Sequence, residues 1–392
     1  GSGPDAISTG SGGGVMSSPL VVMAAGGTGG HVFPAEALAE ELIGRGYRLA
    51  LLTDRRGGAF SGILGDLETY RIRAGGVAGK KVWAVLRGGC ELTIGLFQAR
   101  SLLRKLSPKA VIGFGGYASL PTMLAASFDG YATAIHEQNA VLGRANRLLS
   151  SRVSKIATCF DSVRGVPNTI QHKLVPTGMP VRPAVIKNRG TPYPEILTDQ
   201  PLKLLVFGGS QGARILSDVV PAAIRSLNDD IRRRLFITQQ CRQEDLERVG
   251  EAYAEVGVEV NLRSFFKDLP ALIADAHLII GRSGASTIAE LTVIGRPAIL
   301  VPYPHATDDH QSDNAQAIDE AGGGWLINET AFTSGALACR LESLFGLPAV
   351  LERGAVNARA VGRPNATIHL ADLVNDIISN GDNGTLIKGV KS

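Results

Sequence analysis

Short apolar runs alternate with amphipathic stretches along the chain. The runs at 20–25, 49–53, 110–113 and 132–135 have the length and composition of buried strands. Residues 33–42 place apolar side chains at helical spacing, with glutamates between them. Strands that alternate with helices predict a parallel sheet, because parallel strands are joined by crossover connections that are usually helical.

A second series of the same kind occupies the other half of the chain. Its predicted strands are 202–207, 235–238, 278–281 and 298–302, and its clearest helix is 287–293. We therefore predict an α/β protein of two Rossmann-like domains whose parallel sheets face a central cleft. Ligands of such sheets bind beyond the carboxyl ends of the strands.

A proline-rich stretch separates the two series. Residues 175–201 contain six prolines and few periodic apolar positions, which is typical of a linker. Pro34 and Pro297 suit the starts of elements, where a missing N–H costs little. The predicted organisation is a disordered leader or tail at 1–18, an N-terminal domain at 19–178, a linker at 179–200, a C-terminal domain at 201–360, and a helical segment ending in a flexible tail at 361–392.

Composition narrows the class of protein. The 392 residues are 44% hydrophobic and 19% charged, as in a soluble globular protein, and no apolar stretch approaches the ~20 residues that span a bilayer. A formal charge of +4 is too small to indicate a nucleic-acid partner. Four scattered cysteines lack metal-site spacing, so reduced, buried thiols of a cytosolic protein are expected: Cys90, Cys159, Cys241 and Cys339.

Three glycine-rich stretches carry the clearest chemical signal. Residues 26–31, 208–213 and 282–287 each follow a predicted strand and open a helix. Backbone N–H groups at such turns bind phosphate or pyrophosphate. The first stretch fails the dinucleotide fingerprint, because its third glycine would fall at Val32. Asp54, at the end of the second strand, still fits the ribose-binding acid of a dehydrogenase, so a nicotinamide or flavin oxidoreductase remains an alternative.

Polar side chains gather near these turns. His31 lies next to the first glycine turn, where its ordinary pKa near 6.5 suits either a general base or a satisfied histidine at a helix start. Residues 136–139, His-Glu-Gln-Asn, are predicted to form a loop after a strand, with Asn139 a plausible helix cap or sugar contact. Glu290 lies one turn into a predicted phosphate-binding helix, where it is either solvated or bonded to ribose hydroxyls.

Six ordered motifs resemble the MurG family of peptidoglycan glycosyltransferases. They are Gly26 to His31, Gly113 to Ser119, His136 to Asn139, Gly208 to Ala213, Arg282 to Glu290 and Asp309 to Gln311. The resemblance extends from about residue 20 into the C-terminal region. It implies the GT-B architecture, with lipid I held mainly by the N-terminal domain and UDP-N-acetylglucosamine mainly by the C-terminal one. It also implies that the 361–392 segment packs back on the N-terminal domain.

The resemblance assigns roles by motif. His31 is the preferred catalytic base, with Glu137 and His136 as rivals, and Tyr117 and His136 line the acceptor side. Three of the implied donor contacts lie in the first glycine turn of the acceptor half. The full set of implied donor contacts is Thr28, Gly29, Gly30, Asn139, Arg182, Ser210, Phe266, Ala285, Thr287, Glu290, His310 and Gln311. Phe266 is assigned to uracil, Ser210 to phosphate, Glu290 to ribose, and His310 and Gln311 to the sugar hydroxyls. One departure is Met179, which stands where the family's Thr-Gly-Asn-Pro-Val-Arg motif has asparagine.

The implied reaction is an inverting transfer to the C4 hydroxyl of N-acetylmuramic acid in lipid I. Helix N-termini and backbone N–H groups absorb the charge that develops on UDP, so neither a metal nor another cofactor is expected. An undecaprenyl-linked acceptor places the enzyme peripherally at the cytoplasmic face of the bacterial membrane. Residues 77–87, where Lys80, Lys81 and Arg87 surround Trp83, are the predicted contact with anionic headgroups, or alternatively a core helix with a basic flank. A noncatalytic nucleotide-sugar binding protein is the third alternative.

Overall fold

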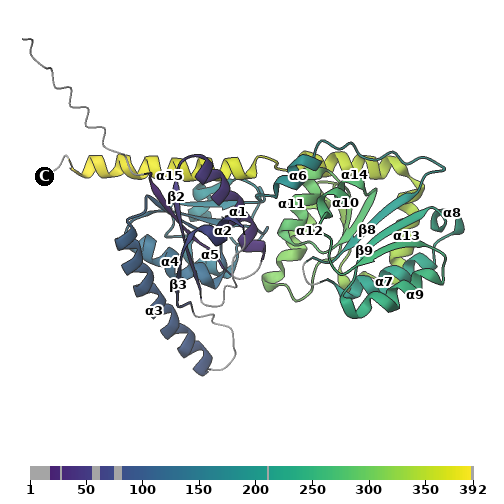
Figure 1. The fold of residues 1–392 in the computed structure, drawn as a ribbon, viewed down its shortest axis with the longest axis horizontal. Helices are drawn as coiled ribbons and strands as arrows, with labels where there is room; N and C mark the ends of the chain where they lie inside the picture. Colours follow the sequence, from purple (N-terminus) through teal and green to yellow (C-terminus); the bar gives the residue numbers. More distant parts are fainter. Residues whose placement is uncertain (1–17, 27–28, 55–61, 75–81, 210–211, 390–392) are drawn as a thin grey trace, which may run out of the picture.

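The computed structural model describes residues 18–26, 29–54, 62–74, 82–209 and 212–389. The predicted leader therefore lies, except for Ser18, outside the described residues. The chain forms two halves that lie side by side, each built on its own parallel sheet (Figure 1). The predicted fold class is confirmed.

The N-terminal half holds a seven-stranded parallel sheet in the described residues, with strand order β3-β2-β1-β4-β5-β6-β7. Its strands are β1 (Leu20–Ala24), β2 (Arg48–Asp54), β3 (Glu68–Ile72), β4 (Ala110–Gly113), β5 (Ala132–Glu137), β6 (Lys155–Thr158) and β7 (Leu174–Pro176). Its helices are α1 (Gly29–Gly44), α2 (Ile63–Asp66), α3 (Val82–Leu106), α4 (Gly116–Phe128) and α5 (Arg144–Leu149).

The C-terminal half repeats the plan with a six-stranded parallel sheet in the order β10-β9-β8-β11-β12-β13, again counted in the described part of the chain. Its strands are β8 (Leu202–Phe207), β9 (Leu235–Gln240), β10 (Glu259–Arg263), β11 (Leu278–Gly281), β12 (Ala298–Leu300) and β13 (Gly324–Leu326). The remaining helices are α6 (Pro183–Asn188), α7 (Arg214–Arg225), α8 (Asp229–Arg232), α9 (Leu246–Ala254), α10 (Leu269–Asp275), α11 (Ala285–Ile294), α12 (His310–Glu320), α13 (Ser334–Gly346), α14 (Pro348–Val361) and α15 (Ala366–Gly389).

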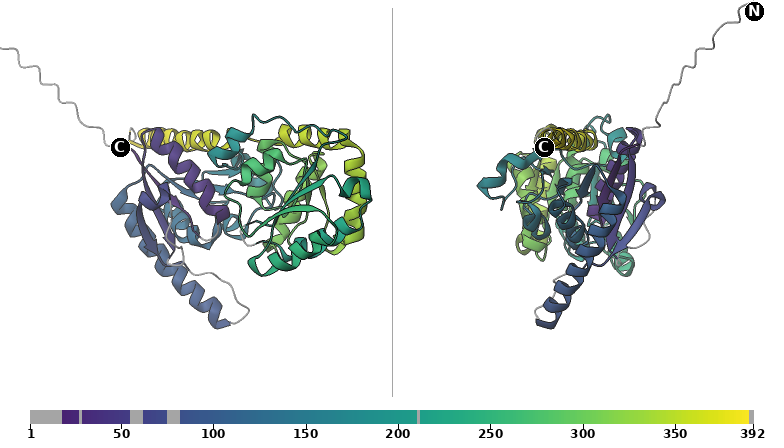
Figure 2. Two further views of the ribbon diagram at one scale, coloured as in Figure 1. Left: turned by 45° about the vertical axis from the view of Figure 1, so that its right-hand side comes forward. Right: turned by 90° about the vertical axis from the view of Figure 1, so that its left-hand side faces the viewer.

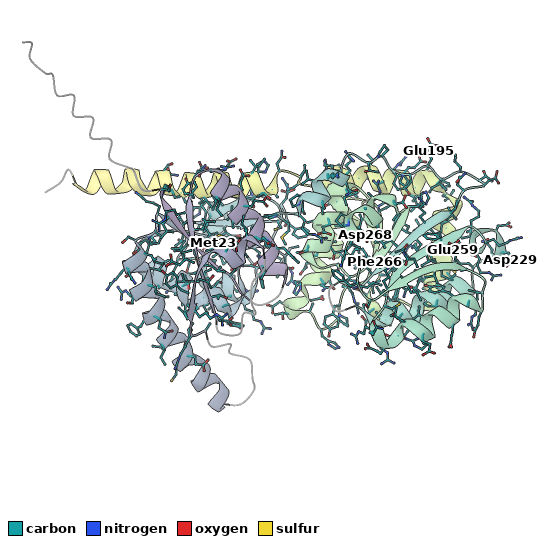
Figure 3. The ribbon with its side chains drawn as sticks, viewed as in Figure 1. Met23, Glu195, Asp229, Glu259, Phe266 and Asp268 are labelled. Carbon is teal, nitrogen blue, oxygen red and sulfur yellow. The ribbon has the colours of Figure 1, made fainter. Side chains whose placement is uncertain are left out.

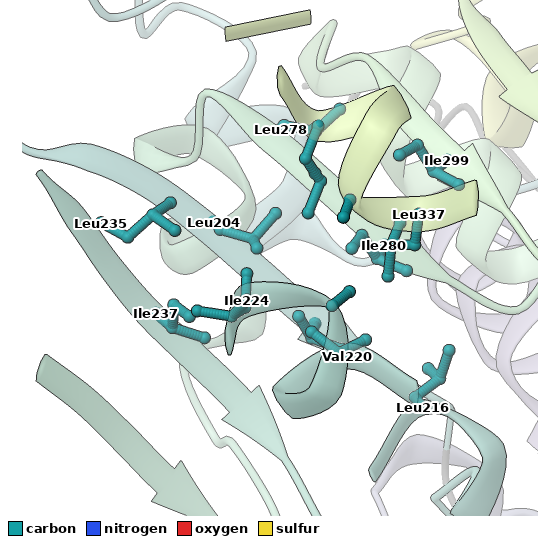
Figure 4. Close-up of a cluster of buried hydrophobic side chains, with 14 of the residues drawn as sticks. Leu204, Leu216, Val220, Ile224, Leu235, Ile237, Leu278, Ile280, Ile299 and Leu337 are labelled. Carbon is teal, nitrogen blue, oxygen red and sulfur yellow. The ribbon is translucent and has the colours of Figure 1, made fainter. Parts of the chain in front are cut away.

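Apolar side chains fill both faces of each sheet, as expected for parallel sheets covered by helices. In the N-terminal half, one face packs against α1 and α15 and the other against α3 and α4. In the C-terminal half, Leu204, Ile237 and Ile280 contact side chains of α7 and α13 on one face (Figure 4). The opposite face packs against α10, α11 and α12.

The last helix belongs to the N-terminal half in space. Figures 1 and 2 show α15 running back from the C-terminal half along the N-terminal one. Asp372 accepts a hydrogen bond from Arg45, the residue directly after α1, 2.7 Å from Nη1 to Oδ1. Asn375 accepts one from Tyr47, at 2.8 Å. Leu370 and Val374 are fully buried against the first sheet. The described chain therefore passes between the halves twice, once through the linker before β8 and once between α14 and α15.

The strand predictions hold at their cores, and three local predictions are wrong. β5 continues through His136 and Glu137, which are strand residues and not loop residues, because both side chains are buried. Pro34 lies in the second turn of α1 and does not start it, since the helix begins at the glycine-rich turn itself. A proline this close to a helix start removes only one backbone bond. The helix after Asn139 is α5, and its cap is Gly143.

The cysteines are free, as expected, but two of them are not buried. Cys90 and Cys339 are exposed, on the outer faces of amphipathic helices, whereas Cys241 is buried and Cys159 half-buried. Within the described residues, no single helix is long and apolar enough to cross a membrane, although α13 with Pro348–Gly381 passes that test as a pair bent by 93°.

Candidate functional site

The loop after β5 meets α12 at the junction of the two halves. Asn314 of α12 accepts a hydrogen bond from the Ala140 backbone N–H, with 2.8 Å between Oδ1 and N. Its Nδ2 donates to Asn139 Oδ1 at 3.1 Å and to the Ser283 carbonyl, also at 3.1 Å. Asn314 is fully buried, so it bridges the loop after β5 to the turn before α11.

His31 lies in the first turn of α1 beside the turn that opens α4. Gly115 and Gly116 have φ values of 84° and 70°, and a Cβ on Gly115 would lie 3.4 Å from His31 Cε1. These glycines allow the backbone to pass close to the imidazole. Burial lowers the pKa of His31 below its usual 6.5, and the charge of His310 across the junction lowers it further, while the Phe114 carbonyl and Gln138 raise it. His31 is therefore neutral at pH 7, as a general base must be.

His136 is entirely buried, unlike His31. Gln138 Nε2 donates to His136 Nδ1 at 3.1 Å. On the other side of the ring, His136 Nε2 lies 3.3 Å from the Gly178 carbonyl. Because a carbonyl only accepts, the proton of the neutral ring is on Nε2. Burial is the main reason that the pKa of His136 is lowered to about 4. The hydrogen bond to Gly178 raises this pKa, and the charge of His31 lowers it, both by less. In this conformation both ring nitrogens have protein partners.

Glu137 holds the loop between β5 and α5. Its Oε1 accepts from the Asn139 N–H at 3.1 Å, and its Oε2 accepts from the Gly143 N–H at 2.9 Å and from Asn146 Nδ2 at 2.8 Å. Burial raises the pKa of Glu137, and these donors oppose that rise. The carboxylate thus orients the residues that contact Asn314.

Glu290 forms an ion pair with Arg182, and the two residues are 108 positions apart in the sequence. Arg182 Nη2 donates to Glu290 Oε1 at 2.8 Å and to Oε2 at 2.9 Å, and Nε donates to Oε1 at 3.0 Å. Glu290 is 9% exposed, so burial raises its pKa, and the charge of Arg182 lowers it. The linker between the halves is therefore attached to the second turn of α11.

Two helix starts in the C-terminal half follow glycine turns. α11 begins after Gly284 with no side-chain cap, which leaves backbone N–H groups near Ala285 and Thr287 available to an anion. At the turn after β8, a Cβ on Gly208 would lie 2.3 Å from the Ala213 backbone nitrogen, so only glycine fits. Ser210 at this turn and Thr28 at the first glycine turn lie outside the described residues, whereas Gly29 and Gly30 are the first residues of α1.

The other predicted site residues are divided between the halves. Tyr117 lies half-buried in the first turn of α4, and His310 and Gln311 begin α12. Gln311 is anchored, because its Oε1 accepts from the Tyr303 N–H at 3.0 Å and its carbonyl accepts from Ser283 at 2.8 Å. Phe266 is buried after β10, near Asp268 (Figure 3).

A cavity of 310 Å³ lies between the halves, beside this site. Its lining includes Cys159 and Met179 on one side and Ala285, Ile288 and Thr292 of α11 on the other. Met179 is buried with its Sδ 3.7 Å from Cys159 Sγ, so the departure from the family motif fills an apolar position. No cluster of three or more histidine, cysteine or acidic side chains suited to a metal occurs in the described ranges.

The sequence did not identify Asn314, Asn146 or the pairing of Arg182 with Glu290. Asn314 lies three residues beyond the last recognised motif, and nothing local distinguishes it from a solvated helix residue. Only the packing of α12 against the other half buries it. The position of Arg182 in the linker motif was visible, but its partner depends on how the linker crosses α11.

Comparisons with known proteins agree over most of the chain. The glycosyltransferase family 28 N-terminal domain matches residues 21–158, and the family 28 C-terminal domain matches residues 203–360. A protein from Paramagnetospirillum magneticum is 59% identical over 92% of this chain and 98% of its own length. A protein from Rhodospirillum rubrum is 54% identical over 92% of both chains. Both are described as UDP-N-acetylglucosamine–N-acetylmuramyl-(pentapeptide) pyrophosphoryl-undecaprenol N-acetylglucosamine transferases.

Solved structures give the same result for the fold. The crystal structure of Acinetobacter baumannii MurG has a TM-score of 0.76 at 30% identity, covering 91% of this chain and 99% of its own. A kitacinnamycin glycosyltransferase, at 14% identity and a TM-score of 0.66, shares the fold alone. The oxidoreductase alternative is therefore wrong. The chain belongs to glycosyltransferase family 28, and its fold is that of the MurG enzymes.

Proposed function

We propose that this enzyme transfers N-acetylglucosamine from UDP-N-acetylglucosamine to the C4 hydroxyl of N-acetylmuramic acid in lipid I, forming lipid II and UDP. The observation that carries the proposal is the place of His31, which lies half-buried beside the glycine turn that opens α4 and within reach of the charge of His310 from the other half. The names of relatives at 59% and 54% identity support the choice of both substrates.

The donor lies mainly on the C-terminal half. Its diphosphate binds the uncapped start of α11, where the helix dipole and free N–H groups favour negative charge. Glu290 accepts the ribose hydroxyls, with Arg182 beside it, and the loop that carries Phe266 receives uracil. The sugar lies between Asn139 and the start of α12. The remaining proposed donor contacts are Thr28, Gly29, Gly30, Ser210, Ala285, Thr287, His310 and Gln311.

The acceptor lies on the N-terminal half near Tyr117 and His31. Its C4 oxygen attacks the anomeric carbon from the face opposite UDP, and the bond from that carbon to the diphosphate oxygen breaks. His31 accepts the hydroxyl proton, and the electron pair leaves with UDP. The helix N-terminus stabilises the charge on the leaving diphosphate because its dipoles are already oriented. Inversion of the anomeric centre follows from this geometry.

The test is transfer of radiolabelled N-acetylglucosamine to a lipid I analogue in the presence of EDTA. Glu290→Ala should weaken UDP-N-acetylglucosamine binding by ~1.5–3 kcal/mol in calorimetric titration, since the ribose hydroxyls lose the carboxylate that accepts their hydrogen bonds. Arg225→Ala is the matched control, because Arg225 forms an exposed ion pair with Glu255 far from the junction. Unchanged donor affinity in Glu290→Ala would remove this carboxylate from the site, and absence of transfer would reject the activity.

The proposal places the acceptor half, 19–178, at an anionic membrane surface on its cytoplasmic side, with the donor half at 201–360 joined to it by the 179–200 linker. α3 projects away from the rest of its half (Figure 1), and Phe97 on it is 63% exposed. Of the predicted contact, residues 77–81 and the side chains of 82–87 lie outside the described residues. Wild type should pellet with anionic liposomes in low salt, and a Lys80, Lys81 and Trp83 triple variant should not. Equal pelleting would move the contact elsewhere.

A further inference from the structure

The segment leading into α12 has an unusual backbone. Of the non-glycine residues that the structure describes, three have positive φ, and two of these are adjacent, Asp308 at 54° and Asp309 at 56°. Left-handed backbone geometry is unfavourable for residues with a Cβ. Aspartate adopts it more readily than most residues do, but still at a cost. Such geometry persists where surrounding contacts impose it, and it is concentrated at functional sites.

Contacts from the other half of the molecule hold Asp308, whereas Asp309 accepts a hydrogen bond from Ser312 of its own half, 2.7 Å from Oγ to Oδ1. Arg144 donates from Nε to both carboxylate oxygens of Asp308, at 3.2 and 3.3 Å, and from Nη2 to Oδ1 at 3.1 Å. Arg164 Nη2 donates to the Asp308 carbonyl at 3.3 Å, and its Nε donates to Asp313 Oδ1 at 3.1 Å. Both aspartates belong to the C-terminal half, and both arginines belong to the N-terminal half.

Both arginines are fixed on their own half. The backbone of Arg164 exchanges hydrogen bonds with the loop after β5, donating to the Ala140 carbonyl and accepting from the Leu142 N–H. Arg144 is the first residue of α5, directly after the Gly143 that Glu137 holds. The loop after β5 therefore presents Asn139 and Ala140 to Asn314 and leads into Arg144, which pairs with Asp308. Arg164, which follows β6 and is bonded to this loop through its backbone, pairs with Asp313.

The strained pair stands directly before His310 and Gln311. The carbonyl and Oε1 of Gln311 are anchored, and His310 bonds the Thr307 carbonyl from Nδ1 at 2.7 Å. The backbone angles of Asp308 and Asp309 thus set where α12 starts and how its first side chains meet the other half. We propose that Arg144 and Arg164 are positioning residues, which hold Asp308, and through it the adjacent Asp309, in the left-handed conformation so that the start of α12 is ordered for the donor sugar.

This inference rests on the proposed function, because it assigns the sugar to His310 and Gln311. The side chains of Arg144 and Arg164 are 61% and 60% exposed. Their ion pairs with Asp308 and Asp313 are therefore weak and open readily. A clamp of weak pairs lets the donor enter and UDP leave, whereas a buried pair would hold the halves shut. Added salt should loosen it, since exposed pairs are screened.

The test compares UDP with UDP-N-acetylglucosamine by calorimetric titration of the full-length protein. The two ligands share the uridine diphosphate, and only the second carries the sugar. In the Arg144→Ala, Arg164→Ala double variant, the dissociation constant for UDP-N-acetylglucosamine should rise about tenfold, while that for UDP should change less than twofold. Adding Asp309→Gly should restore at least half of the lost affinity on a logarithmic scale, because glycine adopts left-handed angles without steric cost. Arg225→Ala is the control that removes an exposed ion pair within one half.

Each outcome decides the matter. Equal weakening of both ligands, no change in either, or a failure of the glycine rescue would overturn the positioning role. If the double variant does not fold, the wild type at 1 M NaCl replaces it, and salt should then weaken UDP-N-acetylglucosamine more than UDP. A wild-type protein that binds neither ligand would reject the proposed function, which separates that failure from failure of the clamp.

Discussion

His31 and His136 are near neighbours at the same edge of the first sheet, yet their surroundings are opposite. His31 is half-buried beside two glycines, and the charge of His310 reaches it from the other half. His136 is sealed in the interior, with one nitrogen bonded to Gln138 and the other near Gly178. Burial lowers the pKa of both, so neutrality at pH 7 does not distinguish them.

The difference is one of access. A general base must reach the proton that it removes, and a ring whose nitrogens are both engaged by protein has none to offer. Burial of a polar ring with complete partners is a structural arrangement, because those partners repay its desolvation. We therefore propose a catalytic role for His31 and an organising role for His136, and four changes test this division.

The largest effect is expected from His31→Ala, which should lower turnover by ~100-fold or more with donor affinity nearly unchanged. Loss of the proton acceptor affects the transition state and not the bound donor. The measurement is kcat from transfer assays, with donor titration alongside. His172→Ala, at an exposed histidine, is the control.

The pH profile sharpens the same test. A base works in its neutral form, so kcat/KM should fall tenfold per pH unit once the pH drops below the pKa of His31, which lies below 6.5. Near-normal turnover in His31→Ala would move the base elsewhere, with Glu137 the next candidate.

The second effect concerns stability in acid. The pKa of His136 is about 4 in the folded protein and near 6.5 when unfolded, so the unfolded chain binds the proton first. Its contribution is intact above pH 6.5 and is lost as the pH falls toward 4, up to about 3 kcal/mol. Urea unfolding at pH 7 and pH 4.5 should show a smaller acid loss in His136→Gln than in wild type. An identical loss would mean that the ring titrates normally and is not sealed.

The sequence predicted the two-sheet fold because apolar periodicity is a local signal, and the strands at 110–113, 202–207 and 278–281 fall where predicted. It also found the motif residues, since glycine turns and the polar ends of strands are local patterns. It preferred His31 as the base but left His136 as a rival. That distinction depends on Gly178 and Gln138, which pack against the ring only in the folded chain.

The interdomain contacts were missed for a related reason. Asn314, Arg144 and Asp308 are ordinary surface residue types, and their roles arise from two halves meeting across more than 160 residues of sequence, as in the separation of 164 between Arg144 and Asp308. Glu290 was assigned to ribose from its helix position, which gave no sign that Arg182 already contacts both of its oxygens.

The third effect tests Glu137, the rival base. Glu137→Gln should destabilise the fold by ~1–3 kcal/mol, because an amide NH₂ would face the donors of Gly143 and Asn146. Turnover should fall less than tenfold, since the loop still forms. The measurement pairs thermal unfolding with kcat, and Asn146→Ala serves as the matched loss of one donor. A hundredfold loss of turnover at unchanged stability would instead make Glu137 the base.

The smallest effect is expected at Met179, which lies near the buried ring of His136. Met179 contacts Cys159, whose Sγ lies 3.5 Å from His136 Nε2, so this sulfur pair covers the sealed ring. Met179→Asn restores the residue of the family motif, but it places an amide where the structure has an apolar contact. Because the neighbouring cavity can hydrate the amide, the cost should be only about 1 kcal/mol, with transfer within threefold of wild type. Chemical unfolding measures it, with Met179→Leu as the apolar control. A stabilised Met179→Asn would show that the amide finds a partner near Gly178 or His136, and the seal around His136 would then be polar in the rest of the family.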